Sequence, residues 1–325
     1  MAVKPEQALR RCMRSWRLSS FVKQPASGSK NLLHLTRDRA GKAVLLKCAP
    51  NPFDAGVTRE ANVLQALAPV MGRGLLLPKR LAFDPSAQVL ALEWLRSAPT
   101  LHDSLCTTRR LAVRLLLELG RSLAQLHLRS ARAQPLFDWA TAPDETLLDC
   151  FIWTRPAFAS RLSIDGTLLI GSVQSDLRAR AGLIELSGNA HARCLIHGDV
   201  KLPNLLVTRR GPVLIDWELA QWGDPAQDLG SLTADLMRRQ IAPDSAREAL
   251  DPRALAQALA AIRRGYASVG GPLGLALRRR VRLWSGAHLL FYAHALVLAE
   301  GALSWASQAL ALRARSLLSE VPRAD

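Results

Sequence analysis

The chain is poor in the features that stabilise and export secreted proteins. It has five cysteines in 325 residues, which is an odd number. The cysteines are widely spaced, and no two of them form a CxxC motif. This pattern indicates neither a disulfide framework nor a zinc site. The N-terminal segment has no apolar run of signal-peptide length, because Arg10, Arg11, Arg14 and Arg17 interrupt it. We therefore expect the protein to work in the reducing cytoplasm.

Lysine is also scarce, since it supplies only seven of the 43 basic residues of a chain whose formal net charge is +16. A protein that neutralises nucleic-acid phosphates needs a dense basic face. The arginines here are scattered singly or in short groups such as residues 278–280, which is typical of a compositional bias. We expect no nucleic-acid partner; the alternative, a basic nucleic-acid-binding protein, predicts steeply salt-dependent binding. The positive field would attract anions, including nucleotides.

Long apolar runs are limited to residues 288–312, a stretch with about the length of a membrane span. It is interrupted by His288, His294, Glu300 and Gln308, and ionisable groups are costly in hydrocarbon. The stretch therefore predicts a buried helix of a helical lobe, and we expect no membrane partner.

The remaining patterns divide the chain into three parts. Residues 1–18 include an amphipathic helix at 5–18, which we expect to pack on the next domain, with binding to a membrane surface as the alternative. Residues 19–95 predict a small antiparallel sheet with one helix across it. Residues 96–325 are mostly helical, beginning with a clear amphipathic helix. The elements expected up to that helix are strands at 32–36, 43–48, 80–83 and 89–94 and helices at 57–67 and 109–128.

One hairpin in the helical part carries charged motifs at both ends. Two short strands within residues 205–215 flank a five-residue turn; Asp199 and Asn204 precede the first strand, and Asp216 follows the second. Phosphoryl transfer requires metal ligands, a cation on the phosphate oxygens and a carboxylate beside the attacking hydroxyl. The hairpin can gather Asp199, Asn204 and Asp216 at one end, and Lys201 is placed to touch the transferring phosphate. These residues predict a kinase.

The segments HGDVKLPNLLV and VLIDWELAQWGDPAQDLGSL resemble the aminoglycoside phosphotransferase and choline kinase-like family. The resemblance implies an α+β, two-lobed protein-kinase-like fold with a small antiparallel-sheet N-lobe and a large, mainly helical C-lobe. It also implies a reaction that uses ATP and Mg²⁺, with Asp199 as the catalytic base and with Asn204 and Asp216 as metal ligands. His197 and Asp228 would hold the catalytic loop in shape, and we expect His197 to be a buried hydrogen-bonding residue rather than an acid or base.

The sheet-rich part supplies the nucleotide side of the predicted site. Lys47 is a lone lysine in an apolar strand, and Glu60 opens the following helix as its partner. Their ion pair would aim the ammonium group at the phosphates of ATP. Gly28 and Ser29 belong to a turn of small residues ahead of the first strand pair, and backbone N–H groups of such a turn can lie over phosphates.

The hinge of the family, which receives adenine through backbone groups, matches residues 93–95. We therefore expect Glu93 and Leu95 to contact the base. The resemblance extends over about residues 20–300 and is strongest over 194–230. It is weak over 130–190, where we expect part of the acceptor specificity.

The sequence does not identify the phosphate acceptor. From residue 231 onward the chain has 13 arginines and 7 acidic residues, whereas kinases of polycationic antibiotics need carboxylates around the acceptor. This balance disfavours an aminoglycoside and favours a neutral or anionic hydroxyl compound or a Ser/Thr peptide. The context Asp216-Trp217-Glu218 resembles superfamily members of ribosomal-peptide maturation, including lanthipeptide-type pathways. Three hypotheses remain: a small-molecule kinase, a peptide kinase and an inactive binding scaffold, the last disfavoured because every expected catalytic residue is present.

Overall fold

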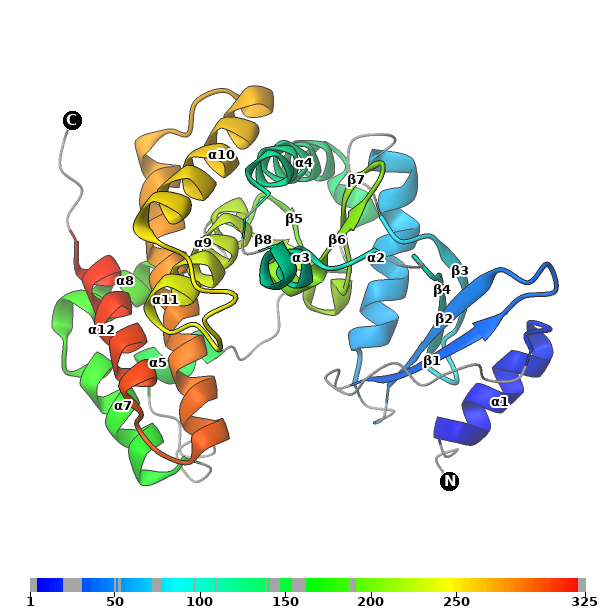
Figure 1. Ribbon diagram of the computed structural model, residues 1–325, viewed down its shortest axis with the longest axis horizontal. Coiled ribbons are helices and arrows are strands. Elements are labelled where there is room, and N and C mark those ends of the chain that lie inside the picture. Colours follow the sequence, from blue (N-terminus) through cyan, green and yellow to red (C-terminus); the bar gives the residue numbers. More distant parts are fainter. Residues whose placement is uncertain are drawn as a thin grey trace.

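The computed structural model has a sheet-rich lobe at one end and a larger helical lobe at the other (Figure 1). This is the α+β, two-lobed fold that the sequence predicts. The structure describes residues 5–19, 31–49, 51, 54–71, 77–95, 98–108, 110, 112–137, 139–140, 147–153, 162–187 and 191–320.

Four antiparallel strands form the sheet of the N-terminal lobe in the order β1-β2-β4-β3. The elements are β1 (Leu32–Arg37), β2 (Ala43–Cys48), α2 (Gly56–Met71), β3 (Arg80–Asp84) and β4 (Val89–Glu93). Helix α2 continues four residues beyond its expected end, because Leu67 and Met71 are four apart and are both buried on the same helical face. The strand order confirms the predicted small antiparallel sheet.

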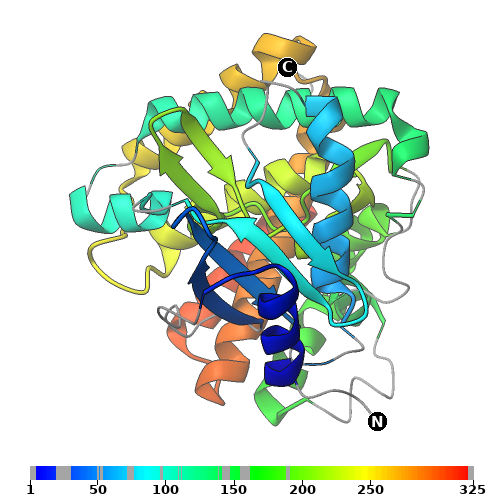
Figure 2. The ribbon, with the colours of Figure 1, turned by 90° about the vertical axis from the view of Figure 1, so that its right-hand side faces the viewer.

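The pleat of β2 separates two environments. Val44 and Leu46 are buried against α1 (Pro5–Ser15), which lies across the outer face of the sheet (Figure 2). Because successive side chains of a strand point to opposite faces, Leu45 and Lys47 face the other way, toward the helical lobe. The packing of α1 confirms that the amphipathic helix covers the next domain.

Two helices and two short two-stranded sheets, the second of which is a hairpin, connect the lobes. They are α3 (Leu101–Thr108), α4 (Val113–Arg132), β5 (Cys194–Ile196) with β8 (Gln221–Gly223), and β6 (Leu205–Thr208) with β7 (Gly211–Leu214). The five-residue turn expected in this hairpin is wrong: β7 begins earlier, and Pro212 pairs with Val207, so only Arg209 and Arg210 form the turn. A proline is tolerated here because both strands of a two-stranded sheet are edge strands.

The helical lobe contains seven further α-helices within its described residues. They are α5 (Leu147–Ile152), α7 (Ile164–Gln174), α8 (Leu177–Leu186), α9 (Pro225–Ile241), α10 (Pro252–Gly270), α11 (Leu275–Glu300) and α12 (Trp305–Ser319), of which α5 is a short one of six residues. Figure 1 shows α11 running beside α9 and α12. Together with α4, these helices bury one core that reaches into the N-lobe and a second one around α11.

The expectation of one buried helix over 288–312 is wrong. The stretch is the end of α11, a bend at Gly301, whose φ is 73°, and the start of α12, which is capped by Ser304. A left-handed glycine ends a helix because it lets the next residues bond back to the last turn. Leu298 and Leu312 are exposed, so the stretch is buried on one side only. Among the described helices, none is both long and apolar enough to cross a membrane.

Candidate active site

A tight loop, residues 197–204, connects β5 to β6. Gly198 in this loop has a φ of 83°, in the left-handed region where L side chains are strained. A Cβ at this position would collide with the backbone oxygen of Leu219. Both the backbone conformation and the space therefore require a glycine between His197 and Asp199.

A fully buried aspartate on α9 holds the start of this loop. Asp228 accepts hydrogen bonds from the backbone N–H groups of His197 and Gly198, both at 2.9 Å. His127 of α4 lies 3.1 Å from the same carboxylate, and its other ring nitrogen lies 2.9 Å from the hydroxyl of Tyr266 on α10. Burial alone would raise the pKa of Asp228, but its bonds to His127 and His197 hold the pKa below its usual value.

His197 is buried, and both of its ring nitrogens bond to backbone groups. Nε2 lies 3.0 Å from the carbonyl oxygen of Ile215, and Nδ1 lies 3.2 Å from the backbone nitrogen of Asp199. Because an N–H can only donate, these partners assign the ring proton to Nε2. The ring also packs edge-on against Trp217. His197 is thus the buried hydrogen-bonding residue that the sequence predicts, and it ties the loop to the end of the β6–β7 hairpin.

Asp199, Lys201 and Asn204 form one contact group at the end of the loop. The Lys201 ammonium lies 2.7 Å from Oδ2 of Asp199. The amide nitrogen of Asn204 donates to the backbone oxygen of Asp199 at 3.0 Å and to its carboxylate at 3.1 Å. Burial raises the pKa of Asp199 above its ordinary value, although Lys201 partly opposes this. The carboxyl group is therefore a stronger base than an exposed aspartate.

Lys47 is only 4% exposed and is surrounded by carboxylates. Its ammonium group lies 2.7 Å from Glu60 of α2 and 3.3 Å from Glu218, and it also bonds directly to Asp216. Burial opposes the charge of Lys47, but the attraction of Glu60, Asp216 and Glu218 outweighs it and raises the pKa of the lysine. Lys47 is therefore held as a fixed positive charge at this position.

Asp216 directly follows the strand residue Ile215 and has a φ of 69°. A non-glycine residue in this region is uncommon and marks a position where other contacts fix the backbone. The Asp216 carboxylate bonds to Lys47, and the next residue, Trp217, is buried. Both features hold the backbone at Asp216 in place. Burial would raise the pKa of Asp216, but Lys47 lowers it below the ordinary value.

A cleft of about 460 Å³ lies between the lobes. Its apolar wall comes from both lobes, with Leu45 and Leu92 on the sheet and Leu206 and Ile215 on the hairpin. The cleft is also lined by six of the residues predicted from the sequence, namely Lys47, Glu60, Glu93, Leu95, Asn204 and Asp216.

Two predicted residues adjoin this cleft, and two lie outside the description. Asp199 and Lys201 reach the cleft through the bonds of Asp199 to Asn204. Gly28 and Ser29 lie outside the described residues.

Sequence reasoning missed several residues that support the site. Glu218 is a third carboxylate on Lys47, and its place two residues after Asp216 was the available signal. Asp235 accepts a hydrogen bond from the N–H of Leu202 at 2.9 Å, and Arg239, 1% exposed, holds Asp235. Nothing local distinguishes Asp235 and Arg239 from an ordinary helical ion pair, since their link to the loop exists only in the folded chain.

Residues 22–284 match the phosphotransferase enzyme family, which covers most of the chain. The chain belongs to this family. The matched residues include the loop around Asp199 and Lys47 with its three carboxylates. No curated protein sequence matches the chain at a significant level.

Solved structures share the fold of this phosphotransferase at low sequence identity. One from Ralstonia eutropha, described as an aminoglycoside phosphotransferase, is 20% identical with a TM-score of 0.62, covering 97% of this chain and 96% of its own. Amicoumacin kinase in complex with AMP-PNP, Ca²⁺ and its antibiotic is 13% identical with a TM-score of 0.67, covering 98% and 94%. Choline kinase from Streptococcus pneumoniae is 17% identical with a TM-score of 0.55, covering 97% and 98%. These similarities establish the fold.

The donor groups of the cleft fit a hard divalent cation. Asn204 and Asp216 line the same cleft and offer an amide oxygen and a carboxylate, which are oxygen ligands of the kind that Mg²⁺ prefers. A second group with metal-ligand spacing in the described part of the chain is His102, Cys106 and Glu248. The guanidinium group of Arg239 bonds to both His102 and Glu248. The positive charge that these side chains could bind is therefore already supplied by an arginine of the protein.

Proposed function

We propose that this phosphotransferase moves the γ-phosphate of ATP to a hydroxyl group of a small molecule. The observation that carries the proposal is that Lys47, Asn204 and Asp216, from three separate segments, line one cleft beside Asp199. A cation for the phosphates, two oxygen ligands for a metal and a carboxylate for the acceptor are the groups that phosphoryl transfer requires. The apolar wall from both lobes suits the planar adenine ring of ATP.

Asp199 is the proposed base. The hydroxyl oxygen of the acceptor attacks the γ-phosphorus, its proton passes to the Asp199 carboxylate, and the bond from phosphorus to the leaving oxygen of ADP breaks. The raised pKa of Asp199 favours this role, because a general base works best when its pKa approaches the working pH. Lys201, which contacts Asp199, is placed to balance the charge of the transferring phosphate.

The other residues bind and orient the nucleotide in this proposal. Mg²⁺ held by Asn204 and Asp216 would supply positive charge beside the phosphates. Lys47, fixed by Glu60, presents its ammonium group to the same region. Residues 19–95 form the nucleotide-binding lobe, with Glu93 and Leu95 lining the base end, and residues 96–325 supply catalysis and acceptor binding.

A small-molecule acceptor is favoured over a peptide. Structures with this fold include enzymes named for small acceptors: amicoumacin, choline and, in a protein from Brachybacterium faecium, macrolides. The arginine excess after residue 231 gives little information about the acceptor. Six of those 13 arginines form ion pairs within the protein, so their charge serves the fold; they are Arg238, Arg239, Arg279, Arg280, Arg282 and Arg315.

A screen for phosphate transfer tests the proposal. Purified protein with ATP and Mg²⁺ is offered hydroxylated metabolites and antibiotics, with Ser/Thr peptides as a second arm, and phosphorylated products are detected by mass spectrometry. We expect a small-molecule product whose rate falls by about 10²–10⁴-fold in Asp199→Asn, with nucleotide binding retained. An Asp199→Asn variant with full activity would remove this residue from the role of base, and products only in the second arm would make the acceptor a peptide.

A further inference from the structure

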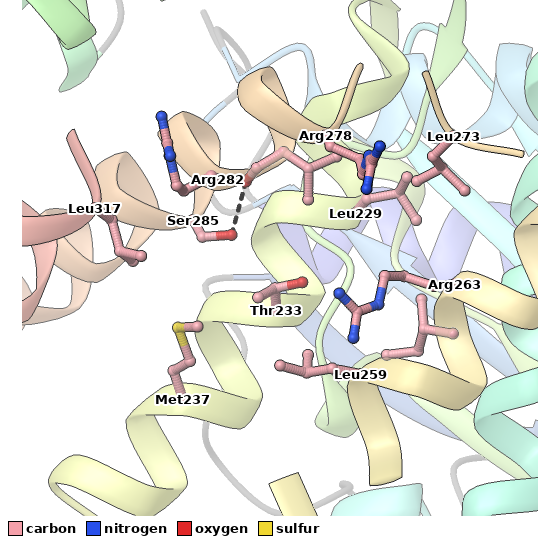
Figure 3. A pocket seen from close by; sticks show the side chains of 12 residues that line it. Leu229, Thr233, Met237, Leu259, Arg263, Leu273, Arg278, Arg282, Ser285 and Leu317 are labelled. Carbon is pink, nitrogen blue, oxygen red and sulfur yellow. Dashed lines mark hydrogen bonds between the residues drawn. The ribbon is translucent and has the colours of Figure 1, made fainter. Parts of the chain in front are cut away.

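A second cavity lies inside the helical lobe, away from the interlobe cleft. It has a volume of about 190 Å³, is open to solvent on one side and is lined by residues of α9, α10, α11 and α12 (Figure 3). Its wall is mainly aliphatic, with Leu229 and Met237 from α9, Leu259 from α10 and Leu317 from α12. None of these residues has a role in the proposed phosphoryl transfer.

Helix α9 separates this cavity from the catalytic loop. Asp228 and Asp235, seven residues apart and therefore on one helical face, bond to the backbone of the loop. Leu229, Thr233 and Met237, four residues apart, lie on a different face and line the cavity. The cavity is thus a site of its own and not an extension of the cleft.

Arginines stand at the edge of the cavity. Figure 3 shows Arg263 extending from α10 toward Thr233 and Arg278 extending from α11 toward Leu229. Within the described part of the chain, neither Arg263 nor Arg278 forms an ion pair, whereas Arg282, which also lines the cavity, is paired with Glu320. Two guanidinium groups without acidic partners beside an apolar cavity provide a positive edge and an apolar interior.

This combination defines a class of ligand. A cavity of about 150 Å³ can hold benzene, so one of 190 Å³ accommodates a slightly larger apolar body. Guanidinium groups bind carboxylates through paired N–H···O bonds. We propose that the cavity binds a small carboxylate whose body is a substituted ring or a compact aliphatic chain, with its charge on Arg263 and Arg278. The Thr233 side chain adds a hydroxyl group beside Arg263.

Binding can be measured without nucleotide, which keeps the test independent of the proposed phosphoryl transfer. The probe is 4-fluorophenylacetate, followed by ¹⁹F NMR, and the matched neutral probe is 4-fluorophenylacetamide, which has nearly the same shape. We expect saturable binding of the carboxylate with a Kd on the order of 1 mM or tighter, and at least tenfold weaker binding of the amide. Equal binding of both probes, or no saturable binding, would overturn the proposal.

Variants locate the site. Arg263→Gln/Arg278→Gln removes both charges and should weaken carboxylate binding at least tenfold. Arg253→Gln/Arg264→Gln removes two exposed charges from α10 outside the cavity and should leave the Kd within twofold of the original. Equal losses in the two double variants would show a general charge effect and contradict the site. We expect that Mg²⁺ and AMP-PNP do not displace the probe. Displacement would mean that the probe binds in the interlobe cleft, which would contradict the proposal. The amide comparison on the unaltered protein stands even if a variant fails to fold.

Discussion

At the scale of residues, Lys47 and its three carboxylates form a buried ionic cluster at the cleft. A buried ammonium group keeps its charge here because Glu60, Asp216 and Glu218 surround it. Two of these acids come from the segment after β7 and one from α2, so the lysine joins the two lobes. Changes at Asp216 should therefore affect nucleotide binding and the contact between the lobes together.

Asp216→Ala should remove the stabilisation that Mg²⁺ with AMP-PNP gives against heat. The variant loses a proposed metal ligand, and ligand stabilisation scales with the logarithm of ligand concentration over Kd. The measurement is the shift in Tm on adding Mg²⁺ and AMP-PNP, which should fall to less than about half of the original shift. Glu300→Ala, which removes an exposed carboxylate at the end of α11, is the control and should keep the full shift. An unchanged shift in Asp216→Ala would contradict the metal-ligand assignment.

The acid limb of the pH–rate profile should report Asp199. A base must be deprotonated, so kcat/KM falls as the pH drops through the pKa of Asp199, and burial places this pKa above the ordinary aspartate value. Lys201 lowers the pKa, so Lys201→Met should move the acid limb to higher pH.

The charge-conserving change gives the control for this experiment. Lys201→Arg should keep the acid limb near its original pH while changing kcat. A limb that stays in place in Lys201→Met would mean that another group controls it.

The sequence predicts the residues of the site that stand within one local motif. Asp199 and Asn204 precede a single hairpin and Asp216 follows it, so the hairpin gathers all three at one end. Lys47 and Glu60 are predictable because a lysine in an apolar strand needs an anion nearby. Asp235 could not be assigned, because its partner Leu202 lies 33 residues away and only packing brings the two together.

At the scale of elements, helices α4 and α10 cross in direct backbone contact. A Cβ on Gly265 would collide with the backbone oxygen of Leu117, and one on Gly120 with that of Ile262. The two glycines thus let the helices approach each other closely. This contact places His127 and Tyr266 where they support Asp228.

Gly265→Ala should destabilise the protein although alanine is normally the better helix former. The added methyl group overpacks the crossing, at a cost of about 1–3 kcal/mol. Gly270→Ala in the same helix is the matched control: its Cβ would meet only Leu128, at 3.7 Å, so it should be neutral or stabilising by up to about 1 kcal/mol. Urea unfolding gives both values, and equal effects would show that the crossing has room for a side chain.

Element boundaries follow from the sequence where periodicity and capping agree. Strand β2 begins and ends as expected, because apolar residues alternate between the α1 face and the cleft. The prediction for residues 288–312 was wrong because apolar residues predominate on both sides of Gly301 and hide the bend there. There the capping signals, a glycine followed by Ser304, were better evidence than hydrophobicity.

At the scale of the whole molecule, the proposed site has a charge opposite to that of the chain. The chain carries a formal +16, yet Glu60, Asp199, Asp216 and Glu218 surround only two lysines in the proposed site. A triphosphate is attracted by the outer field and repelled by these carboxylates at short range. Divalent cations would relieve the repulsion.

Removal of divalent cations should therefore weaken AMP-PNP binding by at least about tenfold, or 1.4 kcal/mol. Calorimetric titrations in Mg²⁺ and in EDTA give the two affinities. Adenosine, which has no phosphate, is the matched ligand and should bind equally in both buffers. If EDTA left the affinity for AMP-PNP unchanged, the carboxylates would not be the barrier that we infer.

The buried carboxylate of Asp228 also has a consequence for how the protein folds. It joins the loop at His197, 31 residues before it in the sequence, to His127, 101 residues before it. Contacts of such long range form late, because the entropy of closing the intervening chain must be overcome first. The loop therefore reaches its working shape only when α4, α9 and α10 have come together. An N-lobe that folded alone would therefore lack a formed loop around Asp199.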